Sequence, residues 1–217
     1  MEADTSILSS NPASAMSPAV AGGVPKAEGE EPQRWFVAMV MHNTEKACAQ
    51  KVKPLLCNLT PEAESVETYV PTQREKHLWR NGRKKMVDRV LCPSYLFIRC
   101  TESTRYLISK YASFVKGFIK DHARTVDQSR IVPFAYITDQ QMDDFRRMVE
   151  QTEMPVTINP STIKQGDMVK VGTGPLKGLK GYMLHDGEGK TTFAICINIL
   201  GSARVELPIS YLEKPDS

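Results

Sequence analysis

The residues best suited to chemistry lie in one basic stretch, residues 74–89. It holds seven Lys and Arg residues against two acids, so its local net charge is +5. The Asn81 and Gly82 pair near its centre strongly favours a two-residue hairpin turn. Cations on an exposed ribbon suit phosphate groups, and Trp79 and His77 could stack on unpaired bases. The alternative is a solvated edge hairpin whose charges prevent aggregation. The predicted nucleic-acid contacts on the ribbon are Arg74, Lys76, His77, Trp79, Arg80, Arg83, Lys84 and Lys85.

A glycine-rich run at 172–178 comes close to two nucleotide-binding patterns. The spacing from Gly172 to Gly178 is one residue too long for a dinucleotide fingerprint, and Lys177 is not followed by Ser or Thr. The run also leads into a strand, so no helix N-terminus follows it to bind a phosphate. Tight turns and bulges explain these glycines better than a nucleotide site.

No residue pattern indicates an enzyme, a metal site or a cofactor site. The histidines at 42, 77, 122 and 185 occur singly, without a carboxylate or cysteine at zinc-ligand spacing. The five cysteines, at 48, 57, 92, 100 and 196, contain no CxxC pair, which argues against a disulfide framework. No Ser, Cys or Lys stands in a recognisable nucleophile motif, although groups distant in sequence could still converge in space. We therefore predict a protein that acts by contact.

Composition limits the class of protein further. The chain has 217 residues, 41% of them hydrophobic, and a formal net charge of +3. Residues 1–33 carry a net charge of −4, are rich in Ala, Ser, Pro, Gly and Glu, and are predicted to be a disordered tail. The longest apolar run, 35–41, is far shorter than the roughly 18 residues that cross a bilayer. The acids Glu2 and Asp4 argue against a secretory signal. We predict a soluble, cytoplasmic protein with no membrane contact.

The ribbon is expected to project from an α+β domain at 34–151. Residues 35–41 read as a strand buried on both faces, and further strands are predicted at 66–70, 95–98 and 114–119. Three helices are predicted: one that starts at Asn43 or Thr44, one at about 103–112, and one that starts at a capping box at 138–141. Pro54 should kink or restart the first of them. If the helices cover one face of a mixed or antiparallel sheet, the other is left apolar and open to a partner. The alternative is that the hairpin or the 121–137 loop covers it.

The remaining residues show a different pattern. Prolines at 155 and 160 predict an extended linker at 152–163. Short strands are predicted at 168–171, 179–185, 191–199 and 204–207, with a Gly-rich turn at 186–189. Closely spaced strands of this kind indicate a small curled barrel at 164–217.

The order of these motifs resembles the NusG family of transcription elongation factors. The resemblance spans residues 34–214. In the first part of the chain the resemblance rests on five motifs: the strand that begins at Trp35, the pair Glu45 and Lys46 at the start of the helix, Tyr69-Val-Pro71, Pro93-Ser-Tyr95 and Val115-Lys-Gly-Phe. In the second part it rests on the KOW-like run from Gly166 through Gly174-Pro to Gly181. It implies an NGN-type α/β sandwich followed by an SH3-like KOW barrel. Family glycines are absent at Ser94 and in the 42–44 turn, and aromatics are absent at Cys92, Leu176 and near Leu200.

The resemblance also implies partners and site residues. The first domain would bind the clamp coiled coil of RNA polymerase through Phe36, Leu91 and Tyr95. His42 and Lys46 would join the hairpin near non-template DNA or nascent RNA. The barrel would recruit ribosomal protein S10 or Rho through exposed Leu176, Leu179 and Leu200.

Three functions remain open at this point. The departures from the family pattern favour a monomeric, specialised paralogue, similar to the UpxY-type antiterminators that act on one operon. A housekeeping factor coupling polymerase to Rho or to the ribosome is the first alternative. A ribosome- or RNA-binding KOW protein is the second.

Overall fold

The computed structural model describes residues 31–80, 82–122, 132–160, 163, 166–185 and 191–214. Residues 31–217 form one compact unit. Its first residues were expected to belong to the tail, but they are attached to the fold. The backbone N–H and hydroxyl of Ser103 donate to the Glu31 carboxylate at 3.1 and 2.9 Å, and Arg99 Nη1 donates to Gln33 at 2.9 Å. The expected tail at 1–30 lies outside the described residues.

The first sheet has five antiparallel strands centred on β1 (Arg34–Met39). Strand β5 (Tyr95–Cys100) pairs with one edge of β1, and β2 (Glu67–Tyr69) pairs with the outer edge of β5. On the other edge, β6 (Gly117–Phe118) and β7 (Tyr136–Ile137) pair with successive parts of β1. The predicted strand at 114–119 is therefore shorter than expected, and β7 had no signal in the sequence.

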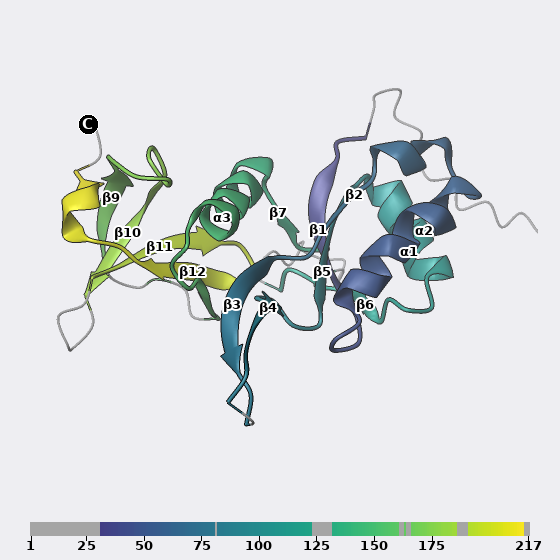
Figure 1. Ribbon diagram of the computed structural model, residues 1–217. Helices are drawn as coiled ribbons and strands as arrows, with labels where there is room; N and C mark the ends of the chain where they lie inside the picture. The colour runs from purple at the N-terminus through teal and green to yellow at the C-terminus, as the bar shows by residue number, and fades with distance from the viewer. Residues whose placement is uncertain are drawn as a thin grey trace, which may run out of the picture. The chain divides into compact units, whose positions relative to one another are not determined.

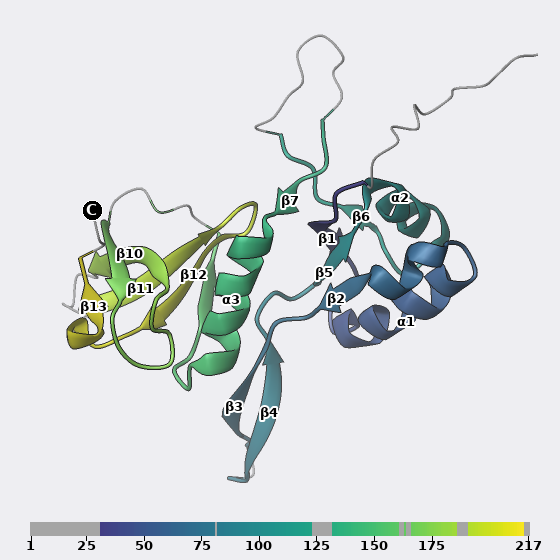
Figure 2. The same ribbon diagram turned by 90° about the horizontal axis from the view of Figure 1, so that it is seen from above.

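Helices cover both faces of this sheet (Figure 1, Figure 2). Phe36 and Ala38 of β1 face α1 (Glu45–Cys57) and α2 (Glu102–Tyr111), in a core shared with Val52 and Ile108. The alternating side chains point the other way, where Trp35 and Val37 pack with Met142, Phe145 and Met148 of α3 (Asp139–Gln151). The expectation of an apolar face left open is wrong for the sheet centre, because the amphipathic third helix covers it.

The helix boundaries follow local chemistry only in part. Thr138 and Gln141 form the predicted capping box of α3. Thr44 occupies the N-cap position of α1, but its hydroxyl donates to the Met41 carbonyl at 2.7 Å and caps nothing. Pro54 lies inside α1, which continues to Cys57. A short 3-10 helix, η1 (Pro61–Ser65), then leads into β2.

The basic stretch forms a separate two-stranded sheet of β3 (Thr72–Leu78) and β4 (Lys84–Val90). The predicted two-residue turn is wrong. Gly82 N–H donates to the Trp79 carbonyl, Trp79 N–H donates to the Arg83 carbonyl, and Gly82 has φ +75°. This is the pattern of a three-residue hairpin loop with glycine in the left-handed position. Asn81 itself lies outside the described residues.

Residues 157–213 contribute a six-stranded antiparallel sheet in the order β13-β9-β10-β11-β12-β8. Phe193, Ile195 and Ile197 alternate into its core, as their spacing predicted. Ile199 was expected to extend that strand but stands in a turn with φ +79°. The predicted linker contains a strand, because β8 pairs with β12. The predicted turn at 186–189 lies outside the described residues. The six strands are β8 (Thr157–Asn159), β9 (Asp167–Val171), β10 (Lys180–His185), β11 (Thr191–Ile197), β12 (Gly201–Glu206) and β13 (Leu212–Glu213), with a 3-10 helix η2 (Ile209–Tyr211) before the last.

Candidate nucleic-acid interface

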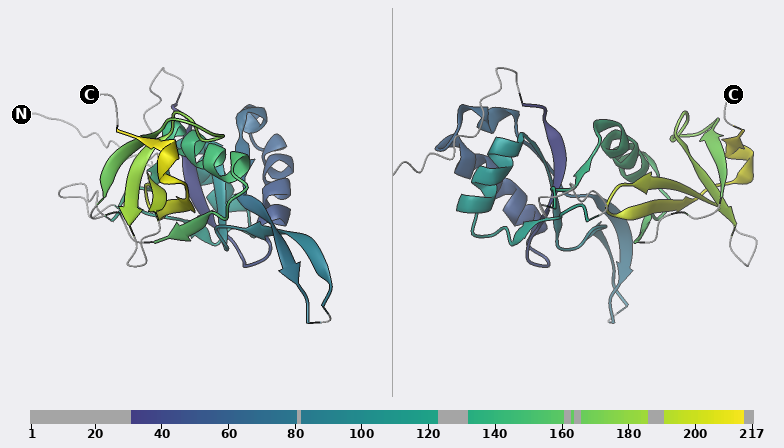
Figure 3. Two further views of the ribbon diagram at one scale, coloured as in Figure 1. Left: turned by 60° about the vertical axis from the view of Figure 1, so that its left-hand side comes forward. Right: turned by 180° about the vertical axis from the view of Figure 1, so that it is seen from behind.

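The hairpin β3–β4 extends away from the first sheet (Figure 1, Figure 3). No described residue of either strand is buried. Leu78 at the end of β3 is 61% exposed, and Trp79 in the turn is 51% exposed. Large apolar side chains left in solvent beside cations are suited to contact with a nucleic acid.

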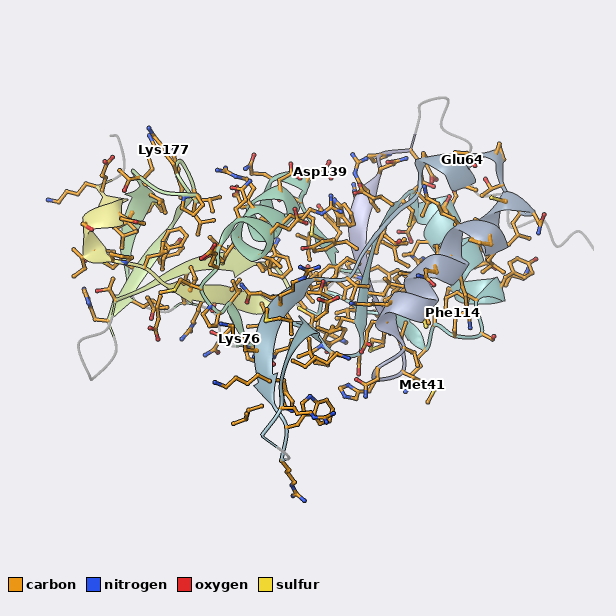
Figure 4. All side chains as sticks on the ribbon, in the orientation of Figure 1. Met41, Glu64, Lys76, Phe114, Asp139 and Lys177 are labelled. Atoms are coloured by element: carbon orange, nitrogen blue, oxygen red, sulfur yellow. The ribbon has the colours of Figure 1, made fainter. Side chains whose placement is uncertain are left out.

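The charges on the hairpin are separated along its length. Both acids lie toward its base, where Asp88 pairs with Lys46 at 3.2 Å and Arg74 at 3.7 Å, and Glu75 pairs with Arg89 at 3.4 Å. The outer part, residues 76–85, has no acid and carries Lys76, Arg80, Arg83, Lys84 and Lys85. Figure 4 shows Lys76 on this ribbon. The sequence-predicted cations are therefore concentrated where a polyanion could approach.

The two faces of the hairpin differ in chemistry. Residues paired across an antiparallel ladder share a face, so His77 and Lys85 lie on one side. The Trp79 and His77 rings meet edge to face with centroids 5.1 Å apart. The opposite side carries Leu78 paired with Lys84, and Lys76 paired with Met86. One face thus offers aromatic rings beside cations, and the other offers flexible aliphatic side chains beside cations.

The start of α1 adjoins this ribbon. Lys46 reaches Asp88 of β4, which brings a residue implied by the family resemblance to the hairpin base. His42 and Met41 are exposed in the turn just before the helix. Met41 was not predicted, since a single methionine at the end of a strand carries no signal in the sequence.

The three residues expected to contact polymerase do not share a surface. Phe36 is 2% exposed and faces α1 and α2, where its ring packs edge to face on Phe118. Tyr95 is half-buried and pairs with Met39, on the side of the sheet that α3 covers. Leu91 is buried beside the hairpin base, and its N–H donates to the Pro71 carbonyl. Next to it, burial raises the pKa of Cys92 to about 12, so this residue remains a thiol.

A groove of about 850 Å³ runs beside the base of the hairpin. The Gln73 side chain closes one end of it by donating to the Thr152 and Met154 carbonyls and accepting from Val156 N–H at 2.8 Å. Sequence reasoning missed Gln73, because nothing local marks a glutamine that bonds to a segment about 80 residues later. The lining on the hairpin side includes Arg74, Glu75, Lys76 and Met86, and the lining on the other side includes Val149, Glu150 and Glu153.

The leucines expected to be exposed in the C-terminal sheet are buried. Leu176, Leu179 and Leu200 are 1%, 1% and 8% exposed and belong to the core formed with strand residues such as Phe193. The expectation failed because glycine turns fold these leucines inward. Gly178, for example, adopts φ +90° between two of them, and its N–H donates to the Val171 carbonyl.

The described parts of the chain contain neither a candidate metal site nor a membrane-spanning helix. These residues contain no group of three or more His, Cys, Asp or Glu side chains able to hold a metal ion. None of the helices seen in the same parts is long and apolar enough to span a membrane.

Comparison with known proteins places these features in a family. The model of the family described as "Transcription termination factor nusG" matches residues 33–166, more than half of the chain. The chain belongs to the NusG family. The proteins named "Transcription termination/antitermination protein NusG" from Escherichia coli K12 and from Salmonella typhi are each 25% identical to this family member over 186 residues. The alignments cover 84% of this chain and 96% of each relative.

Among solved structures, the chain is similar to that described as "Domain interaction in Thermotoga maritima NusG". The identity is 19% and the TM-score 0.46, over 85% of this NusG-family chain and 98% of the other. The "Crystal Structure of MjSpt4:Spt5 complex conformation B" matches at 14% identity with a TM-score of 0.28, over 84% and 97% of the two chains.

Proposed function

We propose that this protein is a non-enzymatic transcription elongation factor that binds RNA polymerase and suppresses pausing or termination. The family match and the termination and antitermination activity in the names of its relatives support this function. The observation that carries the proposal is the hairpin, whose outer part bears only basic charges and whose acids are engaged at its base. A ribbon of this kind suits a protein that works beside nucleic acid.

The hairpin contacts non-template DNA or nascent RNA. Its cations bind phosphates, which gives affinity without sequence information. Trp79 and His77 add base stacking, which is compatible with single strands because every base has an aromatic face. His42 and Lys46 extend the contact at the start of α1.

The polymerase contact lies at the base of the hairpin, on the clamp coiled coil. Tyr95 supplies a half-exposed aromatic ring, and Leu91 supports the strand that leads to it. The groove at the hairpin base carries both signs of charge, with Arg74 and Lys76 on the hairpin wall and acids on both walls, so a helix bearing both signs of charge could bind there. Phe36 contributes from within the core, by fixing β1 against the helices.

The operon-specific form of this function has support from the C-terminal sheet. The resemblance implies that a housekeeping factor would contact S10 or Rho through Leu176, Leu179 and Leu200, but these are buried. The exposed apolar residues of this region are different ones and include Met168, Ile199 and Ile209. We assign residues 34–151 to the NGN-like domain, 152–163 to the linker and 164–217 to a KOW domain. The factor acts as a cytoplasmic monomer, and the burial of the three leucines argues against contact with S10 or Rho through them.

Binding to purified core RNA polymerase tests the proposal. We expect Tyr95→Ala to weaken binding, whereas Tyr106→Ala, which removes an exposed tyrosine from α2, should leave it unchanged. Equal affinities for both variants would contradict the assigned contact. In a pull-down from cells, recovery of ribosomal RNA without polymerase subunits would instead support the RNA-binding alternative.

Transcript mapping after deletion of the gene tests the range of action. Loss of the long transcripts of one operon is expected. Altered termination across many genes would favour the housekeeping role.

A further inference from the structure

Two loops beside the hairpin base contain residues in strained conformations. Asn43, in the turn between β1 and α1, has φ +65°, and Ser94, in the turn before β5, has φ +69°. Residues with a side chain adopt this left-handed region at a cost, which is why glycine is common there.

One carboxylate holds both turns. Glu45 is buried, and its Oε1 atom accepts the backbone N–H of Ser94 at 2.7 Å and that of Asn43 at 3.1 Å. A third bond links the same region, because Val40 N–H donates to the Ser94 carbonyl at 2.9 Å. An ionised carboxylate that accepts two backbone N–H groups makes strong, short bonds. The turns are therefore joined through a single oxygen atom.

The arrangement also reaches the hairpin. Lys46 follows Glu45 on the first turn of α1 and pairs with Asp88 of β4 at 3.2 Å. Two consecutive residues thus connect three elements that carry proposed contacts: the turn with His42, the turn that leads to Tyr95, and the basic ribbon.

We propose that Glu45 is a positioning residue for this interface: its carboxylate fixes the 41–44 and 92–95 turns and so sets where His42 and Tyr95 stand relative to the hairpin. The inference rests on the proposed function for what the surface binds. It assigns a role that a buried acid at a helix start would not otherwise have, since Glu45 reaches solvent too little to contact a partner itself.

The chemistry predicts an order among variants of the full-length protein. Glu45→Ala leaves two backbone donors without a partner in a buried place, so the strained turns relax. Glu45→Gln keeps one acceptor oxygen of the same reach but loses the charge, so its effect is intermediate. Introducing Ser94→Gly removes the strain at one turn, and we expect Glu45→Ala to cost less binding in that background.

Glu62 provides a matched control away from the hairpin. Its Oε2 atom accepts the hydroxyls of Thr101 and Thr104, each at 2.9 Å, and so joins η1 to the start of α2. Glu62→Gln weakens a comparable carboxylate bridge that holds no proposed contact. A change in melting temperature is expected for both sites, but a change in binding only for Glu45.

Amide hydrogen exchange and polymerase binding together form the test. In Glu45→Ala the amides of Asn43 and Ser94 should exchange at least tenfold faster, and affinity for purified core polymerase should fall about tenfold, with Glu45→Gln between the two. Glu62→Gln should bind as the wild type does. Unchanged exchange at the two amides, or an affinity loss no greater than that of Glu62→Gln, would overturn the role.

The two proposals fail in different ways. A wild-type protein that does not bind core polymerase refutes the proposed function. In that case faster exchange at Asn43 and Ser94 in Glu45→Ala still supports the bridging of the turns, and protected amides refute it.

Discussion

Removal of cations from the hairpin should lower the salt dependence of nucleic-acid binding by a calculable amount. The change is Lys76, Lys84 and Lys85 to Ala together. All three lysines are exposed, and they lie on the part of the ribbon that has no acid. The acids at the base pair with Lys46, Arg74 and Arg89, so they do not neutralise the three lysines. Each lysine is expected to displace about one counterion from a bound strand.

The magnitude follows from counterion release. The slope of log K against log salt is about −0.7 for each phosphate neutralised on a single strand, so three contacts contribute about −2. Between 50 and 200 mM salt, a slope difference of that size changes the affinity ratio of wild type to variant roughly 20-fold. The variant should therefore bind much more weakly at low salt and approach the wild type as salt rises.

Fluorescence anisotropy with a labelled single-stranded DNA measures this slope directly. The control removes Lys53, Lys110 and Lys120, which are exposed outside the hairpin and change the net charge equally; Lys53 Nζ donates to the Glu64 carbonyl, beyond the far end of α1. Their effect should be small, because at about 100 mM salt charges more than roughly 10 Å from the ligand are screened. An unchanged slope in the hairpin variant, or an equal loss in the control, would show that the ribbon is only a solvated edge.

Three further predictions concern stacking, strain and acid stability. Trp79→Ala should weaken binding of single-stranded DNA by about 1–3 kcal/mol with the salt slope unchanged, while Leu78→Ala, on the other face, should have less effect in the same titration. Ile199 has φ +79°, so the Ile199→Gly variant should be more stable than Ile199→Ala by about 1 kcal/mol, the reverse of the usual order. Thermal melts of the two variants measure this difference, and a more stable Ala variant would show that the position is not strained. Burial alone would raise the pKa of Glu45, but the backbone N–H groups that it accepts, among them those of Ser94 and Asn43, outweigh burial and lower that pKa. The Glu45 carboxylate therefore stabilises the fold at neutral pH, and this stabilisation is lost as the pH falls through the lowered pKa. Wild type should accordingly lose more stability than Glu45→Gln between about pH 5 and pH 3 in urea titrations, and parallel curves would contradict the bridge.

Periodicity and capping predicted most of the first domain. The apolar run from Trp35, the α3 face with Phe145, and the Thr138 capping box each depend on residues close in sequence, so their signals are strong. The short strands β7 and β8 could not be predicted in the same way, and β6 was predicted too long, as part of 114–119. Two or three residues carry no period, and their pairing depends on partners supplied by the rest of the fold.

The candidate site was predictable where it depends on composition. The charge of the ribbon and its aromatic residues are visible in the sequence, and the structure leaves them exposed. Burial was predicted for the strand that contains Phe36, but not that α1 and α2 would cover this residue. Burial was not predictable at Leu176, since the direction of its side chain depends on which turns pack around it. Glu45 was recognised only as part of a motif, because its bonds to the 92–95 turn join residues 49 positions apart.

The two hairpin strands contribute no buried side chain among their described residues, and they pair only with each other. Substitutions between Arg74 and Arg89 therefore cost the rest of the fold little free energy, apart from those that touch the pairs at Asp88 and Glu75. Selection can rewrite the ribbon and change ligand preference without compensating changes in the core. The same freedom makes it a suitable segment for grafting: a ribbon exchanged between related factors at Gln73 and Leu91 should carry its preference with it, and the recipient should keep its own stability.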